Sequence, residues 1–252
     1  MVETMTQAPF YLDWKFWAVV VSFLALVLSQ LPPIHIMLRR AKLDVEAYSR
    51  IHFTHRVGNP NAQLHLIVSN VGGREIKIKS IALHFKRGND DQFTLPAQNY
   101  LQEPGDKDTV LLTSFKLKPK DEWAHIANFL NFFSRTDEKT FRQLESNLKN
   151  DIFEKKELPE NKDTVVEADT ENVQPIIEFF HRKFRWEPGE YEISLEIKTE
   201  PQHASVSKRY RVTLFESDSA ELKSYSDDYK YGAGVYWNNS RHTGLILPLI
   251  EA

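Results

Sequence analysis

Histidines and paired carboxylates are the residues of this 252-residue chain best suited to acid–base chemistry or metal binding. His52 and His55 lie three residues apart, a spacing that would place both on one face of a helix. The alternating apolar residues around them predict a strand, on which these two side chains point to opposite faces. The pairs Asp90–Asp91 and Asp227–Asp228 lie in polar stretches typical of solvated turns. The sequence therefore predicts no metal site and no catalytic residue.

Motifs and composition narrow the chemistry further. The chain contains no Walker loop and no G-x-G-x-x-G, G-x-S-x-G or H-E-x-x-H motif. It contains no cysteine, which excludes thiol nucleophiles, disulfides and cysteine-ligated zinc. The 32 Lys and Arg residues against 35 Asp and Glu give a net charge of −3, without the positive excess of nucleic-acid-binding domains. We therefore expect no cofactor and no nucleic-acid partner.

The elements that would position a site begin with an apolar segment. After a short N-terminal segment, 1–13, residues 14–38 carry a single Lys, Lys15, and no Arg, Asp or Glu. A helix needs about 20 apolar residues to cross roughly 30 Å of bilayer hydrocarbon. The sequence therefore predicts a single-pass transmembrane helix over 14–38, which kinks or ends near Pro32 and Pro33.

Basic residues predict the orientation of this helix. Arg39, Arg40 and Lys42 lie in the juxtamembrane linker 39–47, whereas the N-terminal side has only Lys15. Lys and Arg residues are enriched in cytoplasmic loops, so the pattern predicts an inner- or plasma-membrane protein whose C-terminal domain is cytoplasmic. The opposite orientation, which exports the domain, is the alternative.

Small residues share one face of the predicted helix. Ala18, Ser22, Ala25 and Ser29 are spaced by four, three and four residues. Small side chains let membrane helices approach closely, and serine can add a hydrogen bond between helices. The pattern predicts a packing seam for a second copy of the chain or for a partner helix. Coincidence on a lipid-facing surface is the alternative.

Residues 48–217 contain the period-two alternation of β-strands, most regularly over 191–197. The apolar residues change parity at Lys79–Ser80, which predicts a β-bulge. The segment 68–85, a strand, a tight turn and a bulged return strand, and the segment 186–197, a Pro-Gly turn before a strand, resemble immunoglobulin-like domains. Six to eight short alternating strands joined by turns predict a mainly-β domain, an antiparallel β-sandwich, and the resemblance implies an immunoglobulin-like β-sandwich but no particular function.

Three stripes of apolar residues at helical spacing predict an α-helical insertion over about 120–185. The first stripe covers 123–133, the second covers 141–152 after a capping-box-like start at Ser134, and the third covers 173–184. Because function is often carried by segments added to a common scaffold, the insertion is a candidate contact region.

Aromatic residues indicate where a protein partner would bind. The first predicted helix is apolar over more than half its circumference, as a partner-binding surface would be. The alternatives are packing between the sheet and the other helices, and contact with the membrane as an interfacial helix. The C-terminal extension, 218–252, is rich in tyrosine and tryptophan, and a final strand covering the sheet edge is its alternative. Rigid aromatic side chains are enriched at binding surfaces. The predicted contact residues are Trp123, Phe129, Phe132, Tyr236 and Trp237.

These features together predict a membrane-anchored, non-catalytic binding module: an anchor, a sensor or a subunit of a membrane complex that binds a protein partner. The alternative is a ligand-binding module for a small molecule, lipid or glycan, with Trp123, Trp186, Tyr236 and Trp237 as pocket walls. An enzyme with a site assembled from distant residues is the third reading. A concave pocket would favour the ligand, and a flat exposed patch would favour the protein partner.

Overall fold

The computed structural model describes residues 13–30, 39–88, 91–103, 105, 108–161 and 164–252, and antiparallel strands dominate them. In chain order the elements are α1 (Trp14–Gln30), β1 (Leu43–Ala47), β2 (Arg50–Arg56), β3 (Asn59–Asn70), β4 (Ile76–Arg87), β5 (Asp91–Leu101), β6 (Val110–Leu111), β7 (Phe115–Leu117), β8 (Glu122–Leu130), α3 (Arg135–Glu157), η2 (Pro159–Asn161), α4 (Thr170–Lys183), β9 (Gly189–Glu200), η3 (Gln202–Ala204), β10 (Val206–Leu214), α5 (Glu216–Ser224), η4 (Tyr225–Tyr231), β11 (Leu245–Pro248) and β12 (Ile250–Glu251).

One continuous sheet takes the place of the predicted sandwich. Among the described residues, twelve strands form a sheet in the order β11-β2-β3-β8-β5-β4-β9-β10-β12, with β1 beside β3, β6 beside β5 and β7 beside β4. Strand β5 carries the sheet from one half to the other, because residues 91–96 pair with β4 and residues 97–101 pair with β8. A sandwich consists of two separate sheets packed face to face. The prediction of an immunoglobulin-like β-sandwich is therefore wrong.

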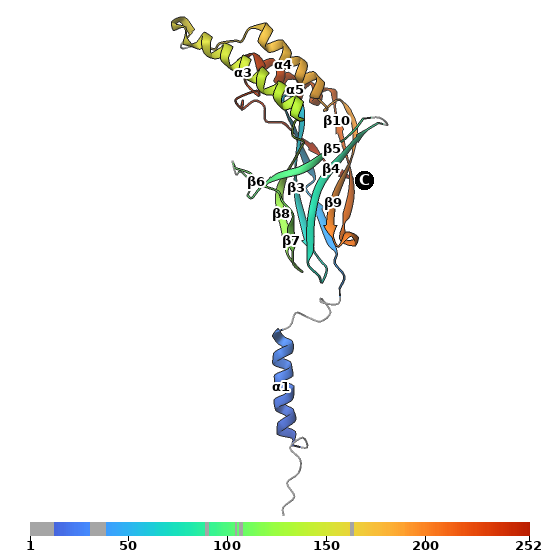
Figure 1. Cartoon of the computed structure of the whole chain (residues 1–252). Helices are drawn as coiled ribbons and strands as arrows, with labels where there is room; N and C mark the ends of the chain where they lie inside the picture. Colours follow the sequence, from blue (N-terminus) through green and yellow to red (C-terminus); the bar gives the residue numbers. More distant parts are fainter. Residues whose placement is uncertain (1–12, 31–38, 89–90, 104, 106–107, 162–163) are drawn as a thin grey trace, which may run out of the picture.

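The last strands nearly close this sheet. Strand β11 pairs with β2 at one end of the strand order, and β12 pairs with β10 at the other. Between them the backbone N–H of Leu249 donates to the carbonyl of Ser49 at 2.8 Å. The segment 245–251 thus joins the two ends, and the sheet wraps barrel-like around one core (Figure 1).

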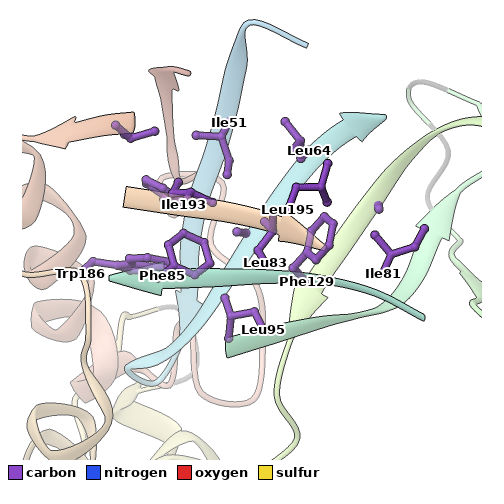
Figure 2. Packing of buried hydrophobic residues seen from close by; sticks show 14 of the residues in the cluster. Ile51, Leu64, Ile81, Leu83, Phe85, Leu95, Phe129, Trp186, Ile193 and Leu195 are labelled. Carbon is purple, nitrogen blue, oxygen red and sulfur yellow. The ribbon is translucent and has the colours of Figure 1, made fainter. Parts of the chain in front are cut away.

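The core lies inside this curved sheet and follows from the alternation of the strands. In β9, Tyr191, Ile193 and Leu195 are buried, while the residues between them are more exposed. The predicted β-bulge is confirmed, because the pairing of β4 with β9 shifts register between Ile78 and Ser80. Figure 2 shows side chains from several strands in this core, among them Ile51, Leu64, Leu83, Phe85 and Phe129.

The first predicted helix is a strand. Residues 123–130 belong to β8, which lies between β3 and β5, so the prediction of a helix over 123–133 is wrong. The ring centroids of Trp123 and His125 are 5.0 Å apart, as expected for side chains on one face of a strand. His125 thus occupies a position where a strand pattern expects an apolar residue, and the apolar Ile126 follows it. Because the polar and apolar residues are exchanged at these two positions, the spacing of the apolar residues resembled that of a helix.

The second and third stripes form the helices α3 and α4. Ser134 caps α3, because its Oγ accepts the backbone N–H of Asp137 at 3.1 Å. The ammonium group of Lys183, at the end of α4, donates to the Asp137 carboxylate at 2.6 Å and ties the two helices together. Helices α3, α4 and α5 gather at one end of the sheet (Figure 1).

The N-terminal apolar segment forms α1, which is too short for the predicted span. It has 17 residues, or about 26 Å at a rise of 1.5 Å per residue, against roughly 30 Å of hydrocarbon. In the described part of the chain, no helix is both long and apolar enough to cross a membrane. The predicted single-pass transmembrane helix over 14–38 and the inner- or plasma-membrane location are therefore wrong, and the cytoplasmic orientation loses its basis. Residues 31–38 of the prediction lie outside the described residues.

The small residues Ala18, Ser22, Ala25 and Ser29 are exposed on α1. The Oγ of Ser22 donates to the carbonyl of Ala18 at 2.8 Å, and the Oγ of Ser29 donates to the carbonyl of Leu26 at 2.7 Å. Both serine hydroxyls are therefore used inside the helix. The packing seam stays a prediction. Its original reason, close packing of membrane helices, no longer supports it.

Candidate functional site

A cleft lies between the strand β2, the helix α3, the turn η4 and the loop 232–244 that precedes β11. Its volume of about 500 Å³ is in the range of small-molecule pockets. We call it the histidine cleft. Imidazole and aromatic side chains among its lining residues are His52, His55, His242, Tyr225, Tyr229, Tyr236 and Trp237.

Hydrogen bonds fix the loop that forms one wall of the histidine cleft. The backbone N–H of Gly234 donates to the carbonyl of Trp237 at 2.8 Å. The indole N–H of Trp237 donates to the carbonyl of Tyr231 at 3.0 Å. The backbone N–H of Gly244 donates to the hydroxyl of Tyr225 at 3.0 Å. The wall is therefore largely formed before any ligand binds.

Two glycines let aromatic side chains lie against this loop. Gly232 has a φ of +78°, and a Cβ there would collide with the ring of Tyr236. Gly244 has a φ of +79°, and a Cβ there would collide with the imidazole of His52. Side chains other than glycine rarely adopt such φ values. The glycines of the C-terminal segment thus place cleft residues rather than merely turning the chain.

His55 is a structural residue of the cleft wall. Its Nε2–H donates to the carbonyl of Leu222 at 2.8 Å, and its Nδ1 accepts the backbone N–H of Gly58 at 3.2 Å. Burial, with the rings of Phe180 and Tyr225 alongside, lowers the pKa of His55 to about 4, although the bond to Leu222 opposes this shift. Both nitrogens are occupied, so neutral His55 has none left for a ligand.

His52 and His242 differ from His55, because each uses only one ring nitrogen. Nε2 of His52 donates to the carbonyl of Thr243 at 2.6 Å, and Nε2 of His242 donates to the carboxylate of Asp228 at 3.0 Å. Neither acceptor can donate, so each neutral imidazole carries its hydrogen on Nε2 and a lone pair on Nδ1. Within the described residues, neither Nδ1 has a hydrogen-bond partner, and that of His52 is buried.

Tyr229 adds a third polar atom without a partner. Its side chain is 1% exposed, and its hydroxyl makes no hydrogen bond within the described part of the chain. Its ring packs edge-on against Phe180, with 5.9 Å between centroids. Burial raises the pKa of this phenol far above its ordinary value, so the hydroxyl stays protonated and can donate as well as accept.

Asp228 and Tyr225 hold His242 in place. One carboxylate oxygen of Asp228 accepts from both His242 and the side-chain amide of Asn239, at 3.0 and 2.9 Å. The ring of Tyr225 stacks on the imidazole, with 4.4 Å between centroids and 16° between planes. A carboxylate also orients the imidazole in many enzymes that use histidine as a general base. No hydroxyl of a described residue donates to Nδ1 of His242, however, so this arrangement suits binding more than nucleophilic catalysis.

No group of three or more His, Cys, Asp or Glu residues in the described chain is placed to hold a metal ion. The unpartnered polar atoms of the cleft are hydrogen-bonding groups: in neutral imidazoles, one lone pair on each of two histidines, and one phenol hydroxyl.

The predicted contact residues are divided by the structure. Trp123 and Phe129 are buried in the core on β8, where they contribute packing and no surface. Phe132 is 72% exposed between β8 and α3, away from the cleft lining. Tyr236 is half-buried and Trp237 is 45% exposed, and both line the histidine cleft.

The predicted pocket walls are divided in the same way. Tyr236 and Trp237 line the cleft, whereas Trp123 and Trp186 do not. Trp186 is fully buried, stacks on Phe53 with 4.4 Å between ring centroids, and donates its indole N–H to the carbonyl of Thr54 at 2.6 Å. It is a core residue that supports β2 from behind.

Sequence reasoning missed three residues of the site, His52, Asp228 and His242, whereas Tyr229 lies within the tyrosine-rich C-terminal extension that it singled out. The spacing of His52 and His55 indicates at most a metal pair, and the pair Asp227–Asp228 is typical of a solvated turn. The strand β2 and the C-terminal loop come together through the pairing of β2 with β11, which no local pattern predicts. The cluster of Tyr, Gly, Asn and His over 225–244 was the available signal.

The histidine cleft thus combines a preformed loop, stacked aromatic rings and unpaired polar atoms. Comparison with protein-family models, curated proteins and solved structures gives no match to this chain.

Proposed function

We propose that this protein is a non-catalytic binding module, a sensor or carrier, that takes up a small polar molecule in the histidine cleft. The observation that carries the proposal is the set of polar atoms without partners on the lining residues: the Tyr229 hydroxyl and the Nδ1 atoms of His52 and His242. Unpaired polar groups are uncommon in protein interiors, and they recur at functional sites.

The energetics support a ligand. Leaving a buried donor or acceptor unpaired costs about 1–3 kcal/mol, which a ligand that supplies the missing hydrogen bond recovers. Because the loop 232–244 is already fixed by its own hydrogen bonds, binding orders little additional backbone. The aromatic rings around the polar atoms supply contact area, as in most small-molecule pockets.

The test is a saturation-transfer NMR screen of the full chain against monosaccharides, free amino acids and nucleosides. Wild-type protein is compared with Tyr229→Phe and Trp237→Ala, and His84→Gln is the matched control, because His84 lies on β4 outside the cleft. We expect signals from at least one probe class that weaken in both cleft variants and persist in the control. Absence of binding in all classes, or binding that ignores both cleft variants, contradicts the proposal.

A further inference from the structure

We propose that the ligand of the histidine cleft is a neutral polyhydroxylated molecule, a saccharide, whose hydroxyl groups donate to Nδ1 of His52 and of His242. This inference rests on the proposed binding function and adds the chemical class of the ligand.

In its neutral form, each imidazole is an acceptor toward the ligand. The Thr243 carbonyl and the Asp228 carboxylate each take the Nε2 hydrogen of one histidine, which leaves a lone pair on each Nδ1. A ligand that satisfies both atoms must therefore bring hydrogen-bond donors. Phosphates, sulfates and carboxylates in their ionised forms bring only acceptors and are disfavoured by this pair.

The Tyr229 hydroxyl is best satisfied by a ligand group that both donates and accepts hydrogen bonds. It is buried, protonated and without a partner among the described residues. A ligand hydroxyl meets this requirement as well as that of the imidazole lone pairs, because it donates one hydrogen bond and accepts up to two. An ammonium group only donates. Side-chain rotamer changes are common at binding sites, so we expect small shifts to bring these covered atoms into contact.

The charge of the cleft also favours a neutral ligand. Its charged lining residues, apart from histidine, are one cation, Arg56, and one anion, Glu145. Asp228, beside the cleft, is already bonded to His242 and Asn239. Opposite charges in equal number leave these lining residues without a net charge that would favour one sign of ligand. A cation or an anion would also lose its hydration without a dedicated counter-ion.

The aromatic walls suit a ring that has apolar faces. The indole N–H of Trp237 is bonded to the Tyr231 carbonyl, so the tryptophan offers its ring surface rather than its donor. Tyr236 lies next to it in the loop and is half-buried. The negative face of an aromatic ring attracts the partly positive hydrogens of C–H groups, which sugars present on one side of the ring.

The experiment measures binding to the full chain by titration calorimetry with named probes. These are the methyl glycosides of glucose, mannose and N-acetylglucosamine, with glucose 6-phosphate and adenosine as comparators. His52→Gln and His242→Gln each keep an amide N–H for the structural bond and lack the Nδ1 acceptor. Tyr229→Phe removes only the unpartnered hydroxyl. His84→Gln is the control outside the cleft, and the thermal midpoint of each variant checks that it folds.

We expect at least one glycoside to bind more tightly than both comparators. Each histidine variant and Tyr229→Phe should weaken it about tenfold, the equivalent of one hydrogen bond of about 1.4 kcal/mol, whereas His84→Gln should not. Preferential binding of adenosine or glucose 6-phosphate, weakened by the same variants, overturns the saccharide and leaves the binding function standing. Glycoside binding that all three cleft variants retain overturns the inference. Failure of all five probes overturns the saccharide inference, and the binding function is also overturned only if the free amino acids of the wider screen fail to bind.

Discussion

At the scale of residues, the three cleft histidines show that hydrogen bonding rather than sequence position decides what an imidazole does. His55 has both nitrogens occupied and is held neutral, while His52 and His242 keep one nitrogen each for another partner. The difference depends on carbonyls and a carboxylate from distant segments. This difference could not be predicted from the spacing of His52 and His55. That spacing would suit a metal pair only on a helix, and the residues around it predict a strand.

His55 makes stability sensitive to acid. Its pKa is about 4 in the folded protein and about 6.5 in an unfolded chain, so between these values the unfolded state binds more protons. Stability contributed by neutral His55 is complete above about pH 6.5 and is lost as the pH falls toward 4, to a total of roughly 3 kcal/mol. Urea unfolding of the wild type and His55→Gln from pH 7 to 4 measures this, and the variant should have the shallower pH dependence. Equal slopes would contradict the assignment.

The Tyr229 hydroxyl gives a second prediction, in the absence of ligand. Because this buried group has no partner among the described residues, its removal should not destabilise the fold. We expect Tyr229→Phe to leave the free energy of unfolding unchanged or to raise it by about 1 kcal/mol. Tyr191→Phe is the control, because the hydroxyl of Tyr191 donates to the carbonyl of Glu187 at 2.7 Å and its loss should lower stability. A large loss in Tyr229→Phe would show that the hydroxyl has a partner.

At the scale of elements, local patterns predicted what local interactions determine. The regular alternation in β9, the bulge at Lys79–Ser80 and the start of α3 at Ser134 each depend on neighbouring residues, and each is present. The prediction of a helix over β8 was wrong because His125 lies on the same face as Trp123, where a strand pattern expects an apolar residue. Tertiary packing therefore determined this strand against the local period. The continuous sheet could not be predicted either, because the role of β5 in both halves depends on pairing with distant strands.

The cap of α3 is testable by itself. Ser134→Ala removes the acceptor for the N–H of Asp137 and should lower the free energy of unfolding by about 1 kcal/mol. Ser134→Thr keeps the hydroxyl and should retain most of the stability. Chemical denaturation of the three proteins measures these differences. Indistinguishable midpoints for the wild type and Ser134→Ala would show that the Ser134 hydroxyl does not stabilise α3.

At the scale of the whole molecule, closure of the sheet depends on the segment 245–251. Leu247 faces the core from β11, whereas its neighbour Ile246 is 61% exposed on the other face. We expect Leu247→Ala to lower the free energy of unfolding by about 2–4 kcal/mol and Ile246→Ala to lower it by less than about 1 kcal/mol. Thermal unfolding of the two variants measures both losses in stability. Equal losses would mean that β11 contributes no inward packing.

The same closure governs how the chain must fold. Phe53 pairs with Leu245, a separation of 192 positions (245 − 53), whereas β9 and β10 pair across a short connection. Contacts so distant in the chain form slowly, because their loop-closure entropy is lost before they stabilise anything. Before the segment 245–251 docks, the strands β2 and β10 are unprotected edges, because β11 covers β2 and β12 covers β10. Refolding yield should therefore fall as protein concentration rises, with the exposed edges as the point of aggregation.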